Sequence, residues 1–378
     1  MKINLSSNLI NIILSRLSKV SNTPLLDLAL IYKKYSKDSL QTAVIIANIS
    51  GSSKRLSMDI FKILPFFIDI IKRINYWPIA YITQSKYFYN YEFQIKKGVL
   101  IPRPESEILV DAGILFSIIK IMREIQKFEK IKNSIIYDLI SKQIGHDMKK
   151  EYGILSIEYY KLINLKEKLI DELKDGILCE EYKYKIQNRY KNGSDKIQFC
   201  EFCSGSAAIS ISLIRKLLDF NLKSNCFCFD ISRKSNLIAK KNAKIILGKE
   251  DSSINIIKSN ILKENFLLKL SNLQNRIFDF ILANPPYIDK KDFANLPLEV
   301  KNHEPKIALV PKERQNIFYE KIIYYSSFLL KENGFIAFEV SDTKHANSIA
   351  KILHEKGYWA LIVYDFQNIG RVVIGQKG

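Results

Sequence analysis

Hydrophobic positions along the chain change their spacing near residue 76 and again near residue 197. Up to about residue 75, apolar residues recur three or four positions apart, as at Leu9, Ile12, Ile13 and Leu17, which is the spacing of one face of a helix. Residues 76–93 are instead aromatic and β-prone (YWPIAYITQSKYFYNYEF), a composition that favours a hairpin or a linker. We therefore predict a small helical domain over 1–75 and a hairpin or linker over 76–113.

From residue 197 onward, short apolar runs alternate with helical segments. The runs are 197–202 (IQFCEF), 226–230 (CFCFD), 254–258 (INIIK), 278–283 (FDFILA) and 334–340 (GFIAFEV), and 359–364 and 371–374 close the chain. Strands that alternate with helices are typical of a doubly wound, largely parallel sheet. The pattern predicts an α/β, Rossmann-like domain over 196–378 with a seven-stranded sheet.

The segment 114–195 fits neither of these patterns. It is rich in Lys, Glu, Ile and Tyr, and it combines mixed charge with helical spacing, as in 159–173 (YYKLINLKEKLIDEL). Charge of mixed sign is more typical of a solvated face than of a binding surface. We expect a lysine-rich helical insertion.

The sequence Asn284-Pro285-Pro286-Tyr287 follows the apolar run 278–283. It should lie at the carboxyl end of that strand, where open α/β sheets bind their ligands. The Asn284 side-chain oxygen and the Pro285 carbonyl can each accept an N–H from a planar NH₂ group, and Tyr287 can stack on its plane. Pro286 stiffens the turn without donating a competing N–H. The alternative is a rigid turn, because N-P and P-P pairs are ordinary loop punctuation.

Polar or small residues also follow the first three strands of the predicted sheet. After 197–202 comes a turn whose small residues let the backbone approach a ligand at a helix N-terminus: Cys203, Ser204, Gly205, Ser206 and Ala207. Asp230 ends the second strand, where a carboxylate typically accepts hydrogen bonds from ribose hydroxyls. Asn260 follows the third strand and is placed to meet an adenine edge. Each has an alternative as a turn or cap residue, but their order on successive strands favours a nucleotide-like cofactor.

This order of Asp230, Asn260 and NPPY on successive strands resembles a class I S-adenosylmethionine-dependent methyltransferase. Further segments resemble one family of that class, the HemK/PrmC protein-glutamine methyltransferases that act on peptide-chain release factors. These segments are 77–82 (WPIAYI), 99–107 (VLIPRPESE), 302–305 (NHEP) with 308–309, 338–339, and Asp365 with 370–373 (GRVV). LIPRPESE discriminates best, because enzymes that modify a ribosomal-protein glutamine or an adenine amino group share NPPY but usually differ there or lack it.

The resemblance implies S-adenosyl-L-methionine as cofactor and methyl transfer to the amide nitrogen of the glutamine in the Gly-Gly-Gln motif of release factors. By position, 203–207 is the glycine-rich loop, Asp230 is the ribose acid, and Asn260 with Ile261 forms the adenine-side loop. Residues 284–287 would hold the substrate glutamine, with Asn284, Pro285 and Tyr287 catalytic and Asn284 also beside the cofactor. The helical domain 1–75 would be the substrate-binding domain that helps to hold the release factor. Catalysis would rest mostly on orientation, which can supply several kcal/mol.

Four departures from the family pattern bear on cofactor binding. The family loop reads D-x-G-x-G-x-G, whereas this chain has Glu201 for the acid, and Cys203 and Ala207 for the first and third glycines. We expect the replacement of glycine by Ala207 to have little energetic cost. Cys203 would destabilise the loop by ~1–2 kcal/mol of conformational free energy if its φ is positive. Asn260 replaces an Asp, and the insertion splits the junction before the cofactor strand. Two alternatives therefore stand beside the leading hypothesis: a methyltransferase for a ribosomal-protein glutamine or a nucleic-acid amino group, and a degenerate, non-catalytic protein that binds release factors.

Charge and cysteine content narrow the possible partners and compartments. The net charge of +19 favours an acidic partner, but it is scattered, and without a nucleic-acid-binding motif we expect no stable nucleic-acid partner. Five Cys and no secretory signal indicate a reducing compartment. We expect a cytoplasmic protein, with the mitochondrial matrix or another organelle as the alternative, because residues 1–26 are basic and contain Ser but no acidic residue before Asp27.

Neither a metal site nor a membrane span is expected. Four of the Cys, at 200, 203, 226 and 228, lie in or beside predicted buried strands, where Cys acts as a small apolar residue rather than a zinc ligand. The apolar run 63–71 is too short to span a membrane and contains Asp69. We expect a monomer.

Overall fold

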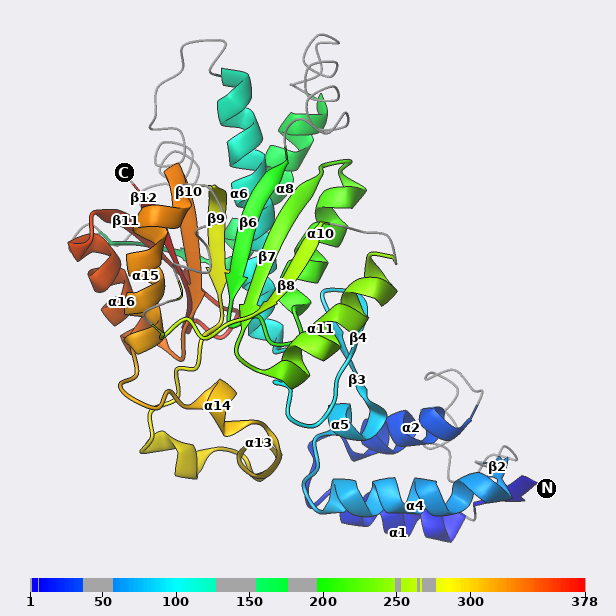
Figure 1. Ribbon diagram of the computed structural model, residues 1–378. Coiled ribbons are helices and arrows are strands. Elements are labelled where there is room, and N and C mark those ends of the chain that lie inside the picture. The colour runs from blue at the N-terminus through cyan, green and yellow to red at the C-terminus, as the bar shows by residue number, and fades with distance from the viewer. Residues whose placement is uncertain are drawn as a thin grey trace. The chain divides into compact units, whose positions relative to one another are not determined.

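The computed structural model describes residues 2–5, 7–36, 57–126, 154–175, 196–248, 253–263, 266 and 277–377 (Figure 1). The chain divides into two compact units, which we describe separately. Unit 1 comprises 1–86, 94–101 and 294–305, and unit 2 comprises 87–93, 102–293 and 306–378.

Unit 1 is the helical region that the sequence predicts. Its elements are α1 (Ser7–Leu17), α2 (Pro24–Tyr35), α4 (Ile60–Ile74), α5 (Ile79–Thr83) and a two-stranded sheet of β1 (Lys2–Asn4) and β2 (Ser57–Asp59). The apolar positions that recur at helical spacing form its core, where Leu17, Leu28, Ile31 and Phe66 are fully buried. Asp59 begins α4 by accepting the Phe61 N–H at 3.0 Å, as an N-cap residue does.

The last segment of unit 1 contains α13 (Leu298–His303), which follows the short helix η4 (Asp292–Asn295). Arg73 donates to Glu299 over 2.9 Å, and the ring of Trp77 lies 4.9 Å from that of His303. The sequence alone assigns this segment to the domain that begins at residue 196, whereas these contacts belong to unit 1. The WPIAYI and NHEP segments of the sequence therefore meet within one unit.

A hairpin follows α5, in the region where the sequence favours one. Its strands are β3 (Ser85–Phe88) and β4 (Tyr91–Gln94). Tyr89 and Asn90 between them have φ values of 48° and 68°, and two consecutive positive φ angles are the mark of the tight turn that suits a two-residue hairpin.

Unit 2 contains an eight-stranded sheet. In spatial order its strands are β5 (Ile154–Glu158), β11 (Tyr358–Tyr364), β12 (Gly370–Lys377), β10 (Leu330–Glu339), β9 (Phe278–Ala283), β6 (Ile197–Phe202), β7 (Ser224–Asp230) and β8 (Ile254–Lys258). Only β12 runs antiparallel to its neighbours among these strands. The predicted α/β, Rossmann-like class is confirmed, and β5 is an eighth strand beyond the seven expected.

The strand β5 lies inside the segment expected to be a helical insertion. It pairs in parallel with β11, and α8 (Tyr159–Asp175) follows it. Leu155 and Ile157 are buried between half-buried neighbours, which is the alternation of a strand. Lys166 of α8 lies 2.6 Å from Asp111 on α6 (Glu107–Gln126). The described part of 114–195 is therefore built into unit 2.

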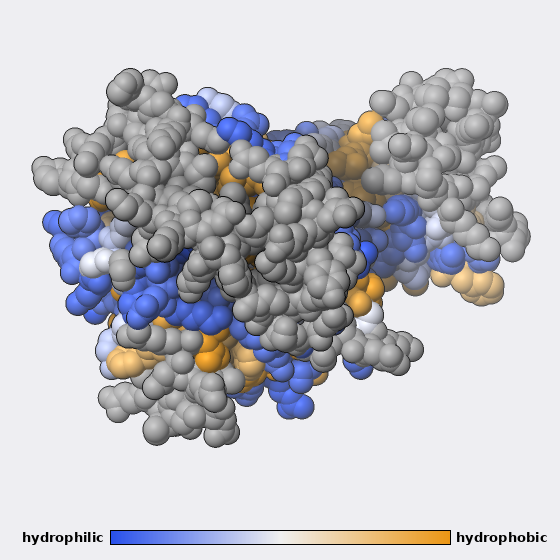
Figure 2. Space-filling model, turned by 90° about the horizontal axis from the view of Figure 1, so that it is seen from above, coloured by the Kyte–Doolittle hydropathy of each residue, from blue (hydrophilic) through white to orange (hydrophobic). Residues whose placement is uncertain are grey.

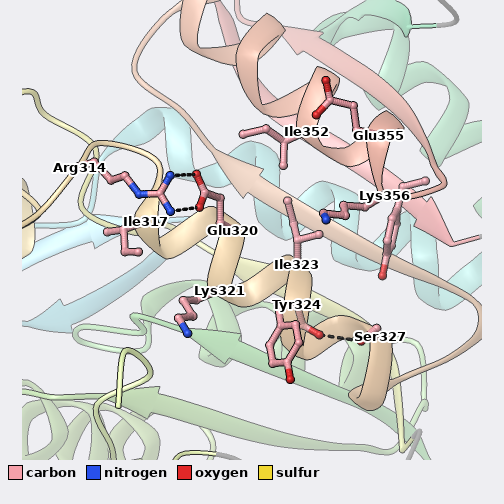
Figure 3. Close-up of a pocket in the computed structure, with 11 residues that line it drawn as sticks. Arg314, Ile317, Glu320, Lys321, Ile323, Tyr324, Ser327, Ile352, Glu355 and Lys356 are labelled. Atoms are coloured by element: carbon pink, nitrogen blue, oxygen red, sulfur yellow. Dashed lines mark hydrogen bonds and ion pairs between the residues drawn. The ribbon is translucent and has the colours of Figure 1, made fainter. Parts of the chain in front are cut away.

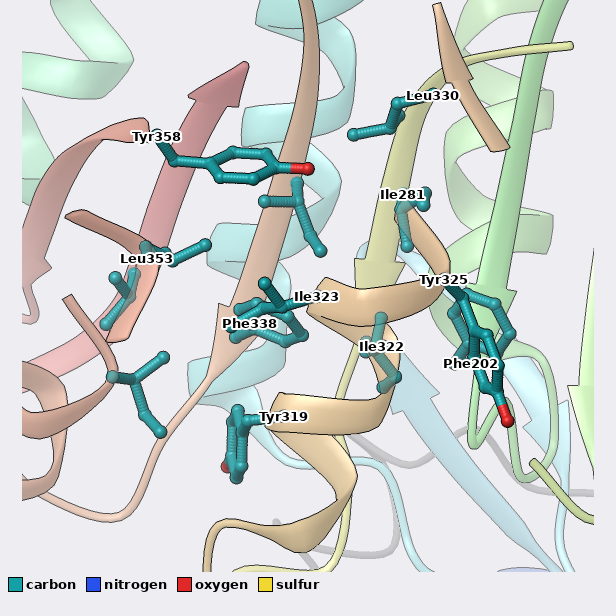
Figure 4. Packing of buried hydrophobic residues seen from close by; sticks show 14 of the residues in the cluster. Phe202, Ile281, Tyr319, Ile322, Ile323, Tyr325, Leu330, Phe338, Leu353 and Tyr358 are labelled. Atoms are coloured by element: carbon teal, nitrogen blue, oxygen red, sulfur yellow. The ribbon is translucent and has the colours of Figure 1, made fainter. Parts of the chain in front are cut away.

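Helices cover both faces of the sheet. On one face the Phe116 ring of α6 stacks on Phe335 of β10 with 4.4 Å between centroids, and α10 (Ala208–Asp219) packs beside α6 while α11 (Arg233–Ile246) packs on β7 and β8. Residues on the opposite parity of the strands, such as Phe338 and Ile281, pack against α15 (Ile317–Leu329) (Figure 4). The helix α16 (Thr343–Glu355) covers β11 and β12. Because successive side chains of a strand point to opposite faces, both faces are buried.

The described surface is largely hydrophilic on the face in Figure 2, with small hydrophobic patches between polar regions. None of the described helices combines the length and apolar character needed to cross a membrane. The remaining short elements are η1 (Pro104–Ser106) and α14 (Lys306–Leu309).

Candidate functional site

The predicted site residues share one edge of the sheet in unit 2. The register of β6 aligns Phe202 with Phe229 of β7 and with Ala283 of β9, so the turns that follow these three parallel strands emerge side by side. β8 is aligned with β7 through Asp230 and Lys258. The structure therefore brings the loop 203–207, Asp230, the turn after β8 and NPPY to the same carboxyl edge, where open α/β sheets bind ligands.

The loop 203–207 has left-handed backbone at three positions. Cys203, Gly205 and Ala207 have φ values of 57°, 55° and 57°. The Ala207 N–H closes the turn by donating to the Ser204 carbonyl over 2.7 Å, and a side chain on Gly205 would meet open space. The expectation that Ala207 costs little is therefore wrong: it pays the same ~1–2 kcal/mol for a left-handed, non-glycine backbone as Cys203.

We expect Cys203→Gly to be more stable than Cys203→Ala by about 0.5–1 kcal/mol in its free energy of unfolding. Both variants lose the thiol, but only glycine relieves the positive φ, and its greater freedom in the unfolded chain removes part of the gain. Denaturant titration measures the difference. The matched pair Cys200→Gly and Cys200→Ala should show the reverse order, because Cys200 lies within β6, where glycine is unfavourable. Equal stabilities at position 203 would contradict the strain.

Asp230 ties the loop to the end of β7. Its carboxylate accepts the Gly205 N–H at 2.9 Å and the Ser232 N–H at 2.7 Å. Burial raises the pKa of Asp230, and these two hydrogen bonds oppose that rise. Ser204 and Ser259 are held at the end of β7 by their backbone N–H groups, which donate to the carbonyls of Phe229 and Asp230. Their buried hydroxyls have no hydrogen-bond partner among the described residues. A carboxylate and two unpaired hydroxyls at one edge fit a ligand rich in polar groups.

Asn260 and Ile261, in the turn after β8, are both expected to border the adenine, but their side chains lie in different surroundings. The Asn260 oxygen accepts the Leu262 N–H at 3.0 Å, which is the cap role that the sequence leaves as the alternative. Its amide nitrogen is therefore the group that it can present to a ligand. The Ile261 side chain is 3% exposed within the hydrophobic cluster, and its carbonyl accepts the Tyr325 hydroxyl at 2.8 Å. These contacts assign the Ile261 side chain to the core.

Glu201, which stands where the family has Asp, is fully buried below the loop. Its carboxyl accepts the Ser210 N–H at 3.0 Å and also the Ser210 hydroxyl. Burial raises the pKa of Glu201 to about 8, although the bonds from Ser210 lower it. Ala207 at the N-cap position provides no side-chain cap for α10. Glu201, near the end of β6, caps the first turn of this helix instead.

The raised pKa predicts that Glu201→Gln gains stability relative to the wild type as the pH rises. The folded protein binds the Glu201 proton more tightly than the unfolded chain does, so the wild type loses this contribution between pH 4.5 and about 8. Gln stays neutral and keeps an oxygen for Ser210. The Tm of Glu201→Gln minus that of the wild type should therefore increase across this window, and exposed Glu355→Gln is the control for removing a surface carboxylate. A difference that does not change with pH would contradict the prediction.

NPPY begins directly after β9, as predicted. The side chains of Asn284 and Tyr287 and the Tyr287 carbonyl form hydrogen bonds with other residues of unit 2. Asn284 donates through Nδ2 to Ser106 Oγ over 3.1 Å. The Tyr287 hydroxyl donates to Glu339 over 3.2 Å, and its carbonyl accepts from Gln315 over 2.9 Å. Burial, followed by the neighbouring Glu339, raises the pKa of Tyr287, so the phenol is neutral. Ser106 and Glu339 lie in segments that carry the family resemblance, but neither is predicted from the sequence as a site residue.

The described cysteines are packed in the core of unit 2. The Cys226 and Cys228 sulfurs are 3.6 Å apart, and burial raises the pKa of both thiols. Neutral, buried thiols are poor metal ligands. Among the described residues, no group of three or more His, Cys, Asp or Glu is arranged to hold a metal ion.

A separate groove of about 610 Å³ lies between α15 and α16 (Figure 3). Arg314 and Glu320 form a two-pronged ion pair at one end, Tyr324 and Lys356 lie toward the other end, and Tyr358 also lines the groove. The groove contains none of the residues predicted for the cofactor or the substrate.

Comparison with known proteins identifies relatives over most of the chain. No family model matches it. A release factor glutamine methyltransferase of Clostridium acetobutylicum is 27% identical over 314 residues, which cover 83% of this chain and 80% of the relative. One of Clostridium botulinum is 28% identical over 82% of this chain and 80% of the relative.

Other relatives are longer than this chain. A bifunctional methyltransferase of Rickettsia conorii is 28% identical over 83% of the chain, which spans 48% of that protein. Among solved structures, a methyltransferase from Pyrococcus furiosus is 15% identical, with a TM-score of 0.34 over 52% of this chain and 81% of that one. That likeness is too low to carry a conclusion.

Proposed function

We propose that this chain methylates peptide-chain release factors. Its resemblance to the HemK/PrmC family of protein-glutamine methyltransferases is confirmed by curated relatives that are named release factor glutamine methyltransferases. The methyl group would pass from S-adenosyl-L-methionine to the side-chain amide nitrogen of a glutamine in the Gly-Gly-Gln motif. The observation that carries the proposal is the placement of the NPPY turn next to the 203–207 loop and on the same edge of the unit 2 sheet as Asp230.

The residues at this edge fit the cofactor. Asp230 would accept hydrogen bonds from the ribose hydroxyls, and the left-handed loop 203–207 would bring backbone close to the methionine part, as small-residue turns at helix N-termini do. The Asn260 amide nitrogen would donate to a ring nitrogen of the adenine, since its oxygen is used within the turn. When bound, S-adenosyl-L-methionine supplies a methyl group made electrophilic by the attached sulfonium.

The substrate side of the reaction falls to NPPY. Asn284 Oδ1 and the Pro285 carbonyl would each accept one N–H of the glutamine amide, and the Tyr287 ring would lie on the amide plane. With both N–H groups held, the nitrogen lone pair is aimed out of the plane, toward the methyl donor. A neutral amide is a weak nucleophile, so holding it in line is the main contribution of the protein, and such orientation can supply several kcal/mol.

Protonation at this edge is consistent with such a mechanism. The Tyr287 phenol is neutral because burial raises its pKa, so it can lie against an amide without placing a full negative charge beside it. No strong base is needed before attack, because the amide proton becomes acidic only once the nitrogen has gained its methyl group. The proton then leaves to solvent.

The test is radiolabelled methyl transfer from S-adenosyl-L-methionine to separate purified substrates. Release factor should incorporate methyl groups. A release factor in which the Gly-Gly-Gln glutamine is replaced by alanine should not. Incorporation into a ribosomal protein or into nucleic acid, with none into release factor, would replace this proposal with the corresponding alternative. Cofactor binding with no incorporation into any of them would leave a binding protein.

A further inference from the structure

Behind Asn284, a chain of hydrogen bonds connects three segments that are far apart in the sequence. Asn284 Nδ2 donates to Ser106 Oγ over 3.1 Å, and Ser106 Oγ donates to Glu339 Oε2 over 2.5 Å. The Tyr287 hydroxyl donates to the other oxygen of the same carboxyl, Glu339 Oε1, over 3.2 Å. The Glu339 carboxyl is thus connected to Tyr287 directly and to Asn284 through Ser106.

Glu339 is held rigidly in this position. It is the last residue of β10, and the pairing of Phe338 with Ala283 sets it beside the start of NPPY. Its side chain is 2% exposed, and its backbone carbonyl accepts the Tyr319 hydroxyl at 2.8 Å. Ser106, at the end of η1, is 3% exposed. Neither side chain lies at the surface, so both act through the groups that they contact.

The direction of these bonds determines which end of the Asn284 amide faces away from the protein. An ionised carboxyl can only accept hydrogen bonds, so the Ser106 hydroxyl must direct its proton to Glu339. Ser106 then offers only lone pairs to Asn284, and these select the NH₂ end of the amide. Among the described residues none donates to Asn284 Oδ1, which is left available as an acceptor.

We propose that Ser106 and Glu339 are positioning residues that fix the Asn284 amide with its oxygen toward the substrate glutamine. This inference rests on the proposed function of NPPY. Asn and Gln amides are nearly symmetric in shape but opposite in hydrogen bonding at their two ends. An Asn284 free to flip would present its NH₂ group to the NH₂ group of the substrate for part of the time, and that arrangement holds no substrate.

The proton on Glu339 gives this arrangement a pH dependence. Burial raises the pKa of Glu339 to about 7; the bonds from Ser106 and Tyr287 and the charge of Arg103 oppose the rise, and Glu105 adds to it. From the other elements around it, Tyr319 contributes a neutral hydroxyl on α15.

Two further charged or titratable groups surround this network. The positive charge of Arg371 on β12 lowers the pKa of the neighbouring Tyr287, against the larger effect of burial. His345 of α16 stays neutral because burial lowers its pKa to about 4. Once protonated, Glu339 donates to Ser106, whose hydroxyl is then free to donate to Asn284 Oδ1 and occupy the acceptor. Activity should therefore fall as the pH falls through about 7.

The test compares kcat and KM of the full chain with those of Ser106→Ala, Ser106→Thr and Glu339→Gln, from about pH 5.5 to about pH 8.5. Ser106→Ala should lower kcat about tenfold or more with little change in the cofactor KM, because the Asn284 amide loses its fixed orientation with the hydroxyl. Ser106→Thr keeps a hydroxyl and should restore kcat. Glu339→Gln carries an NH₂ group that mimics the protonated acid, so its kcat should be low and should not rise with pH near neutrality. Wild-type kcat and pH profile in Ser106→Ala would overturn the inference.

A second readout does not depend on activity. The side-chain NH₂ signal of Asn284 in an NMR spectrum, assigned by its absence in Asn284→Asp, should shift with a midpoint near pH 7 in the wild type and should not do so in Ser106→Ala or Glu339→Gln. A shift that persists in both variants would contradict the inference even if the wild type methylates release factor. If the wild type is inactive on release factor but the signal behaves as predicted, the proposed substrate is wrong and the positioning role stands.

Discussion

Replacing Asn284 with alanine is expected to lower kcat for release-factor methylation by at least about 100-fold, with the fold intact. The change removes one of the two acceptors proposed to hold the substrate amide, and misplacement of a reacting group on the scale of 1 Å can cost about that factor. Asn284 is half-buried at the end of β9 and bonds only to Ser106 among the described side chains, so its loss should have little effect on stability. The measurement is steady-state kinetics at saturating cofactor, with Tm as the check on folding.

Asn255→Ala is the matched control for this prediction. Asn255 also carries a hydrogen-bonded amide in unit 2, donating to Asn225 over 2.9 Å, but it lies within β8, before the strand's carboxyl end. Its replacement should leave kcat near the wild-type value. Wild-type activity in Asn284→Ala would remove the proposed mechanism.

Asp230→Ala is expected to raise the Kd for S-adenosyl-L-methionine by about 10- to 100-fold. Hydrogen bonds to a charged group contribute about 1.5–3 kcal/mol, and each 1.4 kcal/mol is about a tenfold change in Kd. The replacement removes the acceptor proposed for the ribose and also the acceptor of the Gly205 N–H, which holds the 203–207 loop to β7. Isothermal titration calorimetry of the two proteins measures the change directly.

Asp219→Ala controls for the loss of a carboxylate. Asp219 ends α10, and its side chain is 39% exposed in ion pairs with Arg215 and Lys216, which are worth little at a surface. Its Kd should equal that of the wild type. If the Kd of Asp230→Ala also equals that of the wild type, Asp230 is not the ribose acid, whatever the activity of the variant.

The edge of the sheet that carries the candidate site can be predicted from local sequence alone. The segments 197–202, 254–258 and 278–283 coincide with β6, β8 and β9, because each is short, is rich in apolar residues and ends at a turn of small or polar residues. In a parallel sheet, the residues that follow such runs must share one edge. The placement of Asp230 and Asn284 at one edge follows from this rule.

The contacts behind the site could not be predicted in the same way, because they join residues without a local pattern. Ser106 and Asn284 are 178 positions apart, and nothing near Ser106 indicates that it meets the end of β9. Ile261 lies in the turn that was expected to border the adenine, yet its carbonyl accepts a hydrogen bond from the hydroxyl of Tyr325, 64 positions away. The strand β5 alternates as strands do, but the charged helical pattern of α8 beside it concealed the signal.

The glycine loop illustrates a third kind of limit. Against the HemK/PrmC loop pattern the sequence has Cys203 and Ala207 at two glycine positions, but only the backbone angles show that both residues occupy left-handed conformations. A strained loop that persists is held by its surroundings, and here the Gly205 bond to Asp230 and the Glu201 cap of α10 hold it from both sides.

The most direct test of the account is mass spectrometry of release factor after incubation with this protein and S-adenosyl-L-methionine, with Asn284→Ala in parallel. The account predicts one added methyl group on the glutamine of the Gly-Gly-Gln peptide with the wild type, and none with the variant. Unmodified release factor after incubation with a wild-type protein that binds the cofactor, or equal modification by Asn284→Ala, would contradict it.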